Sequence, residues 1–190
     1  MSLKVELLKH QEITTKRLLL RPVRLADAED FYRVGSDPEN NRFTIHYPNM
    51  DAALAGMADY WMGDPLGKYA VVLRGTNQFA GAVEVHLDEK NCKAEIGYLI
   101  TRRFWGNGYA PEAAAALLDL CFNVLNLNRV EAGYDSRNHN SGRVLEKLGM
   151  HVEGRLRNDR MDNGEPITTI IAAITAKEYT EQRAASAAAD

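Results

Sequence analysis

Arg103-Phe104-Trp105-Gly106-Asn107-Gly108-Tyr109-Ala110-Pro111 is the most informative segment of the sequence. It lies between a predicted strand, Ala94–Ile100, and a helix predicted from the apolar stripe between Ala114 and Leu125. Its two glycines let the backbone turn tightly and approach a ligand closely. The first N–H groups of a helix have no partners inside it and lie at the positive end of its dipole, so the stretch predicts a site for an anion such as a pyrophosphate. Arg102 and Arg103 add positive charge beside it.

Two other interpretations of this stretch stand beside the anion site. One is a plain glycine turn before a helix, which a bare Gly-x-Gly would satisfy. The other is a dinucleotide-binding turn, and this one fails in detail. Pro111 stands at the third glycine position, and the loop does not follow the first strand of a βαβ unit with a later acidic residue for a ribose.

The segment before this loop predicts a run of antiparallel strands. Apolar stretches separated by short turns are typical of a meander. A strand that ends at a proline is predicted over Leu18–Pro22, and the meander itself over Tyr69–Leu73, Phe79–Leu87 and Ala94–Ile100. Two helices, over residues 27–34 and 51–62, are expected between the first of these strands and the second.

The segment after the loop alternates between strands and helices. We expect a strand at Arg129–Tyr134 and a short helix at Ser141–Leu148, which Gly149 ends. Two further strands, Met150–Leu156 and Ile167–Ile174, are joined through the hairpin turn signal Asn163-Gly164. The order predicts an α/β fold with a mixed, mostly antiparallel sheet flanked by helices.

The composition is that of an ordinary soluble domain. The 190 residues carry a net charge of −3, whereas a general nucleic-acid binder is usually basic. No apolar run approaches the ~20 residues of a membrane span. Two cysteines, Cys92 and Cys121, without CxxC spacing indicate a reducing compartment and no metal site. We therefore expect one cytoplasmic domain over residues 1–180, with no nucleic-acid or membrane partner, and a flexible tail over 181–190.

Several ordered motifs resemble one family. Arg103-x-x-Gly106-x-Gly108 before a long helix resembles the acetyl-CoA motif of the Gcn5-related N-acetyltransferase (GNAT) superfamily, and Ala94–Tyr98 resembles its central strand. Asn138-x-x-Ser141 followed by Leu145–Met150 resembles the second motif of the ribosomal-protein acetyltransferase (RimJ/RimL-like) branch, as does the opening Arg17–Pro22. The resemblance covers roughly residues 14 to 179. Met150 departs from the branch, which usually has an aromatic residue there.

The resemblance implies a sheet with a central V-shaped splay between two parallel strands, here 94–101 and 129–134. The pantetheine arm of acetyl-CoA would lie in that gap, and the loop backbone would hold the pyrophosphate, with no metal involved. Asn138 would bind the pantetheine arm or stabilise the start of the short helix, and Arg143 would meet a coenzyme A phosphate. The residues expected to bind the coenzyme are Ile100, Arg102, Arg103, Trp105, Gly106, Asn107, Gly108, Tyr109, Ala110, Asn138 and Arg143.

The implied reaction is direct attack of an amine on the thioester, with the coenzyme A thiolate leaving. A lysine amine has a reference pKa of ~10.4 and an α-amine ~7.7–8.0, so an α-amine needs less help from a base. Glu95 is the first candidate base, acting directly or through water, and its alternative is a solvated strand glutamate. Glu84 is the second candidate, and Glu131 is weaker.

The leaving thiolate also needs stabilisation. Many relatives place a tyrosine on the short helix for this purpose, and Leu145 stands at that position here. Ser141 lies four residues earlier on the same helix face, and its hydroxyl can donate a hydrogen bond to the sulfur. The alternative is that Ser141 only caps the helix.

The sequence therefore predicts an acetyl-CoA-dependent N-acetyltransferase whose acceptor is a protein N-terminal α-amine. The branch also includes enzymes that act on small amines, polyamines or antibiotics. A rival from another class is an acyl-CoA-binding regulator without catalysis. We expect a monomer or a homodimer.

Overall fold

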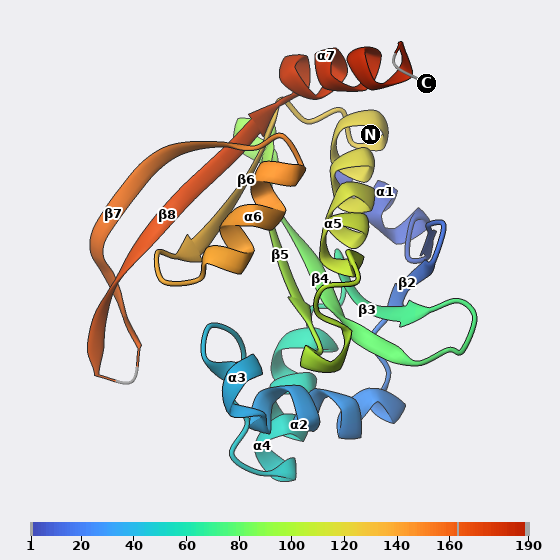
Figure 1. Ribbon diagram of the computed structural model, residues 1–190. Coiled ribbons are helices and arrows are strands. Elements are labelled where there is room, and N and C mark those ends of the chain that lie inside the picture. Colours follow the sequence, from blue (N-terminus) through green and yellow to red (C-terminus); the bar gives the residue numbers. More distant parts are fainter. Residues whose placement is uncertain (1, 163, 189–190) are drawn as a thin grey trace. The chain divides into compact units, whose positions relative to one another are not determined.

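The computed structural model describes residues 2–162 and 164–188. Eight strands form one mixed sheet in the order β1-β2-β3-β4-β5-β6-β8-β7 (Figure 1). The chain divides into two compact units. The first unit contains residues 1–85 and 98–116, and the second contains residues 86–97 and 117–190. Each unit has its own packing.

The first unit holds the predicted antiparallel meander. β3 (Lys68–Leu73) pairs antiparallel with β4 (Phe79–Asp88), as the meander predicts, and β2 (Leu18–Pro22) also pairs antiparallel with β3. A short β1 (Ile13–Thr14), which the sequence did not indicate, pairs with β2. The unit also contains the end of β5 (Lys93–Ile100).

The helices of the first unit build most of its core. They are α1 (Leu3–Lys9), α2 (Ala28–Ser36), α3 (Pro38–Asn41), α4 (Met50–Gly56) and the first turns of α5 (Tyr109–Asp119). A π-helical turn, Met57–Trp61, continues α4, so one helical stretch covers the segment predicted as a helix over 51–62.

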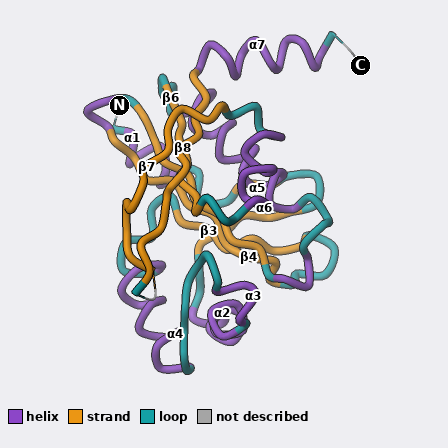
Figure 2. The backbone as a smooth tube through the Cα atoms, turned by 60° about the vertical axis from the view of Figure 1, so that its left-hand side comes forward, coloured by secondary structure: helices purple, strands orange, loops and turns teal. Residues whose placement is uncertain are grey.

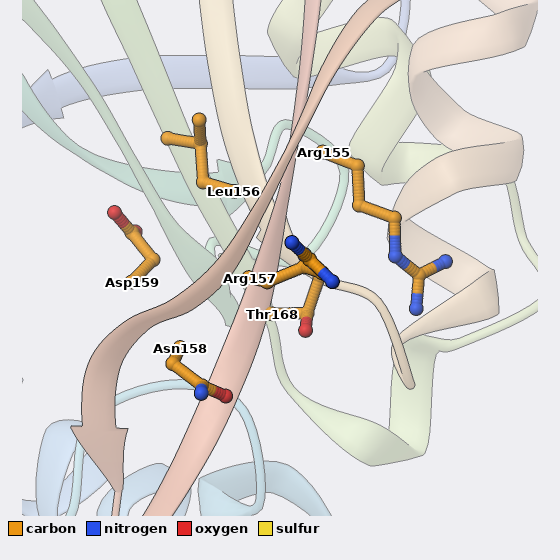
Figure 3. Close-up of a pocket in the computed structure, with 6 residues that line it drawn as sticks. All are labelled: Arg155, Leu156, Arg157, Asn158, Asp159 and Thr168. Carbon is orange, nitrogen blue, oxygen red and sulfur yellow. The ribbon is translucent and has the colours of Figure 1, made fainter.

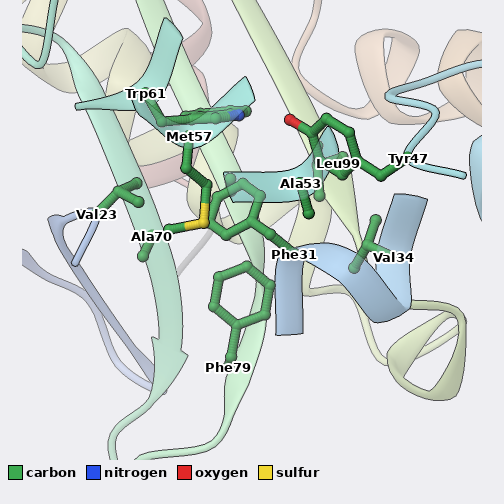
Figure 4. Close-up of a cluster of buried hydrophobic side chains, with 11 residues drawn as sticks. Val23, Phe31, Val34, Tyr47, Ala53, Met57, Trp61, Ala70, Phe79 and Leu99 are labelled. Atoms are coloured by element: carbon green, nitrogen blue, oxygen red, sulfur yellow. The ribbon is translucent and has the colours of Figure 1, made fainter. Parts of the chain in front are cut away.

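Aromatic packing dominates this core. The Phe31 ring lies 5.1 Å from the centroids of both Trp61 and Phe79. Met57 and Val34 are buried beside them (Figure 4). Trp61 and Tyr47 are therefore core residues, at 3% and 8% exposure.

The second unit contains the parallel pair of strands. β5 pairs with β6 (Arg129–Asp135) over three residue pairs, Lys93–Arg129 to Glu95–Glu131. In the described part of the chain the ladder ends there, although both strands continue. The pairing confirms that β5 and β6 are the parallel pair expected in the mixed sheet. The V-shaped splay between their continuations stays a prediction.

A long hairpin completes the sheet of the second unit. β8 (Glu165–Thr175) pairs antiparallel with β6 and with β7 (His151–Asp162). The two hairpin strands run side by side in Figure 2. β7 is longer than the predicted strand, and the predicted turn residue Asn163 lies outside the described residues. Gly164 has φ +83°, as the turn requires.

Two helices belong to the second unit together with the π-helical turn Leu120–Val124 that continues α5. α6 (His139–Lys147) matches the predicted short helix, and Gly149 with φ +74° follows it. α7 (Ala176–Ala187) was not predicted, and Tyr179 on it stacks on Phe122 at 4.8 Å. The flexibility of residues 181–190 and the single-domain assignment stay predictions.

Candidate active site

The glycine loop of the first unit has the backbone that the sequence predicts. Gly106 and Gly108 take φ values of +78° and +76°, a region that glycine enters without steric cost. α5 begins directly after them, at Tyr109. The N–H groups of residues 106–110 find no hydrogen-bond acceptor in the described part of the chain. Five consecutive free donors at a helix start fit the pyrophosphate of acetyl-CoA.

Hydrogen bonds from outside the loop fix its shape. Arg17 on the turn before β2 donates from Nη1 to the Asn107 carbonyl at 2.9 Å, and its guanidinium lies 4.6 Å from the Tyr109 ring centroid. The Trp105 indole donates to the Ile100 carbonyl at 2.7 Å. In the sequence Arg17 is only part of a strand motif, and its role in holding the loop follows from the fold.

Glu112, in the first turn of α5, holds the segment that contains Thr15 and Arg17 through hydrogen bonds. Its carboxylate accepts from Thr15 Oγ1 at 2.6 Å, from the Arg17 backbone N–H at 2.8 Å and from Arg17 Nε at 2.6 Å. Burial by itself would raise the pKa of Glu112, but these hydrogen bonds and the Arg17 charge outweigh it and lower the pKa. The only signal in the sequence was an acidic residue in a first helical turn.

The two arginines before the loop are not both free charges. Arg102 Nε donates to the Asp37 carboxylate at 2.9 Å. Arg103 donates to the Phe79 carbonyl at 3.1 Å, and no carboxylate in the described chain pairs with it. Arg103 is therefore the better candidate of the two for an anion, and phosphate contacts by either one stay predictions.

Buried Asn40 determines how β5 ends. Its Oδ1 accepts from the Arg102 N–H at 2.6 Å and its Nδ2 donates to the Ile100 carbonyl at 2.9 Å. The Ile100 carbonyl thus accepts from two donors, Asn40 and Trp105. A contact between Ile100 and the coenzyme stays a prediction and cannot use this carbonyl without displacing one donor.

The second unit separates two of the candidate bases. Glu131 accepts from Lys93 Nζ at 2.6 Å and from Arg129 Nε at 2.9 Å. Burial would raise the pKa of Glu131, but these two partners outweigh it and lower the pKa. Glu95 is exposed and has no hydrogen bond or ion pair in the described chain. A Cβ placed on Gly133 would lie 3.8 Å from Glu95 Oε1, so its carboxylate lies over β6.

The remaining candidate, Glu84, belongs to the first unit. It accepts a hydrogen bond from the Tyr60 hydroxyl at 2.7 Å. Buried Lys68 lies 3.8 Å from the Tyr60 ring centroid and donates to the Tyr60 carbonyl. The carboxylate of Glu84 is therefore hydrogen-bonded to Tyr60, and Lys68 is its neighbour across the strand pair, whereas Glu95 has no such partner among the described residues.

α6 carries the two polar residues of the second motif. Asn138 is the N-cap, and its Oδ1 accepts from the Ser141 N–H at 3.1 Å. Ser141 is therefore inside the first turn, and its side chain is not the cap. Arg143 is exposed and has no hydrogen bond or ion pair in the part of the chain that the structure describes.

The family model for an acetyltransferase (GNAT) domain matches residues 17–151, which contain this loop, the parallel strand pair and α6. This chain belongs to the GNAT acetyltransferase family. It is accordingly an acetyl-CoA-dependent N-acetyltransferase.

Relatives and solved structures agree with GNAT membership over nearly the whole chain. The chain is 31% identical to "Uncharacterized N-acetyltransferase p20" of Bacillus licheniformis over 175 residues, which cover 89% of this chain and 98% of the relative. The crystal structure of a GNAT-family acetyltransferase from Bacillus anthracis has a TM-score of 0.79 and 27% identity, and the match covers 87% of this chain and 99% of that one.

Two further relatives have names that specify an acceptor. "Putative ribosomal N-acetyltransferase YdaF" of Bacillus subtilis is 39% identical over 85 residues, which are 44% of this chain and 46% of the relative. The spermidine N(1)-acetyltransferase of Escherichia coli K12 is 27% identical over 162 residues, which are 84% of this chain and 87% of the relative.

Among the described residues, no group of three His, Cys, Asp or Glu side chains could hold a metal ion. Burial raises the pKa of the Cys121 thiol to about 12, so it stays protonated at neutral pH. No helix within residues 2–162 and 164–188 is long and apolar enough to cross a membrane.

Proposed function

We propose that this enzyme acetylates a protein N-terminal α-amine, with Glu95 as the base and Ser141 as the donor to the leaving sulfur. The amine nitrogen attacks the thioester carbonyl carbon, the C–S bond breaks, and coenzyme A leaves as a thiolate. The proton lost by the amine passes to Glu95, directly or through water. The Ser141 hydroxyl donates a hydrogen bond to the sulfur.

The observation that carries the proposal is the free carboxylate of Glu95. Glu131 is held by two cations and Glu84 by a tyrosine hydroxyl, so Glu95 is the candidate whose oxygens have no protein partner among the described residues. An α-amine with a reference pKa of ~7.7–8.0 needs less help from a base than a lysine amine at ~10.4, so one carboxylate acting directly or through water suits it better. The ribosomal name of one relative supports the same acceptor.

A polyamine acceptor is the second candidate. It is favoured by the spermidine N(1)-acetyltransferase, which aligns over a larger share of both chains than the ribosomal relative does. A polyamine carries several ammonium groups, which carboxylates without internal partners would recognise.

A thiol-release assay with acetyl-CoA separates these functions. Peptides with free N-termini, matched N-acetylated peptides with one lysine, spermidine and an aminoglycoside are compared at equal concentration. We expect coenzyme A release with free N-termini and much less with blocked ones. Release with spermidine alone would replace the proposed acceptor, and binding of acetyl-CoA without release by any amine would indicate the non-catalytic regulator.

A further inference from the structure

β7 contains a bulge that neither the coenzyme site nor the proposed catalysis uses. Leu156 pairs with Thr169 and Arg160 pairs with Ile167, so residues 157–159 of β7 face the single residue Thr168 of β8. Asn158 within the bulge has φ +53°, a conformation that asparagine tolerates better than most residues. Bulges redirect side chains and occur often next to functional sites.

The bulge and the residue before Leu156 carry two arginines that form no ion pair in the described chain. Arg155 and Arg157 are exposed and have no hydrogen bond or ion pair there. Asp159 is close in sequence, but Figure 3 shows its carboxylate on the opposite side of β7 from the two guanidinium groups. An internal salt bridge therefore does not explain these arginines.

These residues line an open cavity of about 700 Å³ on the surface of the second unit. Its lining consists of Arg155, Leu156, Arg157, Asn158, Asp159 and Thr168, so two arginines stand against one carboxylate (Figure 3). Two guanidinium groups, an amide and a hydroxyl are hydrogen-bond donors, and guanidinium groups match the oxygens of carboxylate and phosphate in pairs.

The cavity adjoins the start of α6. The Thr168 carbonyl accepts from the Ser136 N–H at 2.9 Å, two residues before the cap Asn138 of the helix that carries Ser141. Tyr134, which pairs with Ile170 on β8, contacts α6 at Gly142. Arg155 pairs with the same Ile170, so its side chain extends on the face of the sheet that α6 covers.

We propose that the bulge of β7 is an oxyanion-binding site, and that the carboxylate or phosphate it takes is carried by the amine acceptor. The first statement stands on the cavity and its unpaired arginines. The second rests on the proposed function, because it places the anion in the molecule that is acetylated.

Inorganic phosphate tests the site without any acetyl transfer. The probe is titrated at low ionic strength, where exposed charges are least screened, into the labelled protein and its Arg155→Gln/Arg157→Gln variant. We expect phosphate to shift the amide resonances of residues 155–159 and Thr168. The double variant should bind at least about tenfold more weakly, since hydrogen bonds to charged groups are lost. Lys177→Gln, an exposed charge on α7, is the control and should bind like the parent. Absence of shifts at the bulge overturns the site.

Matched peptides identify the source of the anion. A glutamate is placed at each of positions 2 to 6 of an acceptor peptide and compared with glutamine at the same place. We expect one glutamate position to lower KM about tenfold at unchanged kcat, and the double variant to abolish this difference while acetyl-CoA affinity stays intact. Phosphate binding without any glutamate preference would overturn the acceptor as the source and leave a free anion. Weaker acetyl-CoA binding by the double variant would assign the arginines to the coenzyme. Failure to acetylate any peptide would contradict the proposed function, whereas the phosphate result would stand.

Discussion

Two glutamates face each other at the last pair of the β5–β6 ladder, and their surroundings differ. Glu131 is bound by Lys93 and Arg129, whereas Glu95 on the partner strand has no protein partner among the described residues. The residue type and the strand position are the same. Only the neighbouring side chains distinguish Glu131, a structural carboxylate, from Glu95, which can accept a proton.

Glu95→Gln keeps the shape and removes the base. We expect turnover at neutral pH to fall about 10²–10⁴-fold, and the deficit to shrink as rising pH deprotonates the amine without help. Stability should change by less than about 0.5 kcal/mol, because the side chain is exposed. The matched control is Glu131→Gln, which should lose about 1–3 kcal/mol of stability and keep its turnover. Full-rate turnover by Glu95→Gln at neutral pH would contradict the assignment.

Gly108→Val, again a change of a single residue, tests whether the glycine loop binds acetyl-CoA. Valine at φ +76° is strained by about 1–2 kcal/mol, and its side chain occupies the space that a pyrophosphate would need. Gly164→Val in the β7–β8 turn has a similar φ of +83° with nothing within 4 Å of its Cβ, so it carries the same strain elsewhere. Calorimetry should show weaker acetyl-CoA binding for Gly108→Val alone. Equal affinity in the two variants would remove the loop from the coenzyme site.

Within the element α6, Asn138 caps the helix, and Ser141 is the proposed donor to the leaving sulfur. Asn138 caps the helix through its Oδ1, and the Ser141 backbone, which any residue supplies, is the donor. From the sequence, Ser141 could be either the helix cap or the donor to the sulfur. The structure assigns it to Asn138, because the helix starts at His139 and the cap must precede it.

Ser141→Ala therefore keeps the cap and removes only the hydroxyl. We expect turnover at saturating substrates to fall about 10²-fold, the usual cost of losing one donor to a developing charge, with acetyl-CoA affinity nearly intact. Asn138→Ala should instead lower stability by about 1 kcal/mol, measured by denaturant unfolding. Parent-rate turnover by Ser141→Ala would transfer the thiolate role to water or to Tyr109.

At the scale of the whole molecule, Glu112 links the stability of the chain to pH. Its folded pKa lies below the ordinary value of about 4.3, so its contribution is fully present above that value and is lost as pH falls through the folded pKa. We expect Glu112→Gln to lower the free energy of unfolding by about 1–3 kcal/mol at pH 7. The difference should narrow below pH ~4. Glu146→Gln on α6, without a partner in the described chain, is the control and should follow the parent at every pH. A deficit independent of pH would contradict a charge-based role for Glu112.

Elements with local signals could be predicted from the sequence. Alternating strands, Gly106 and Gly108 before a helix, and Gly149 after one are set by backbone conformation and nearest neighbours, so the meander, the loop and α6 were predicted close to their observed bounds. The sequence did not show α7, the bulge of β7 or the partners of Arg102. Those depend on residues far apart in the chain. Asp37 and Arg102, which are hydrogen-bonded, lie 65 positions apart in the sequence, and Glu112 and Arg17 lie 95 positions apart. Which carboxylates are neutralised, and which one is left free to accept a proton, was decided only by tertiary structure, because electrostatic pairing follows distance in space.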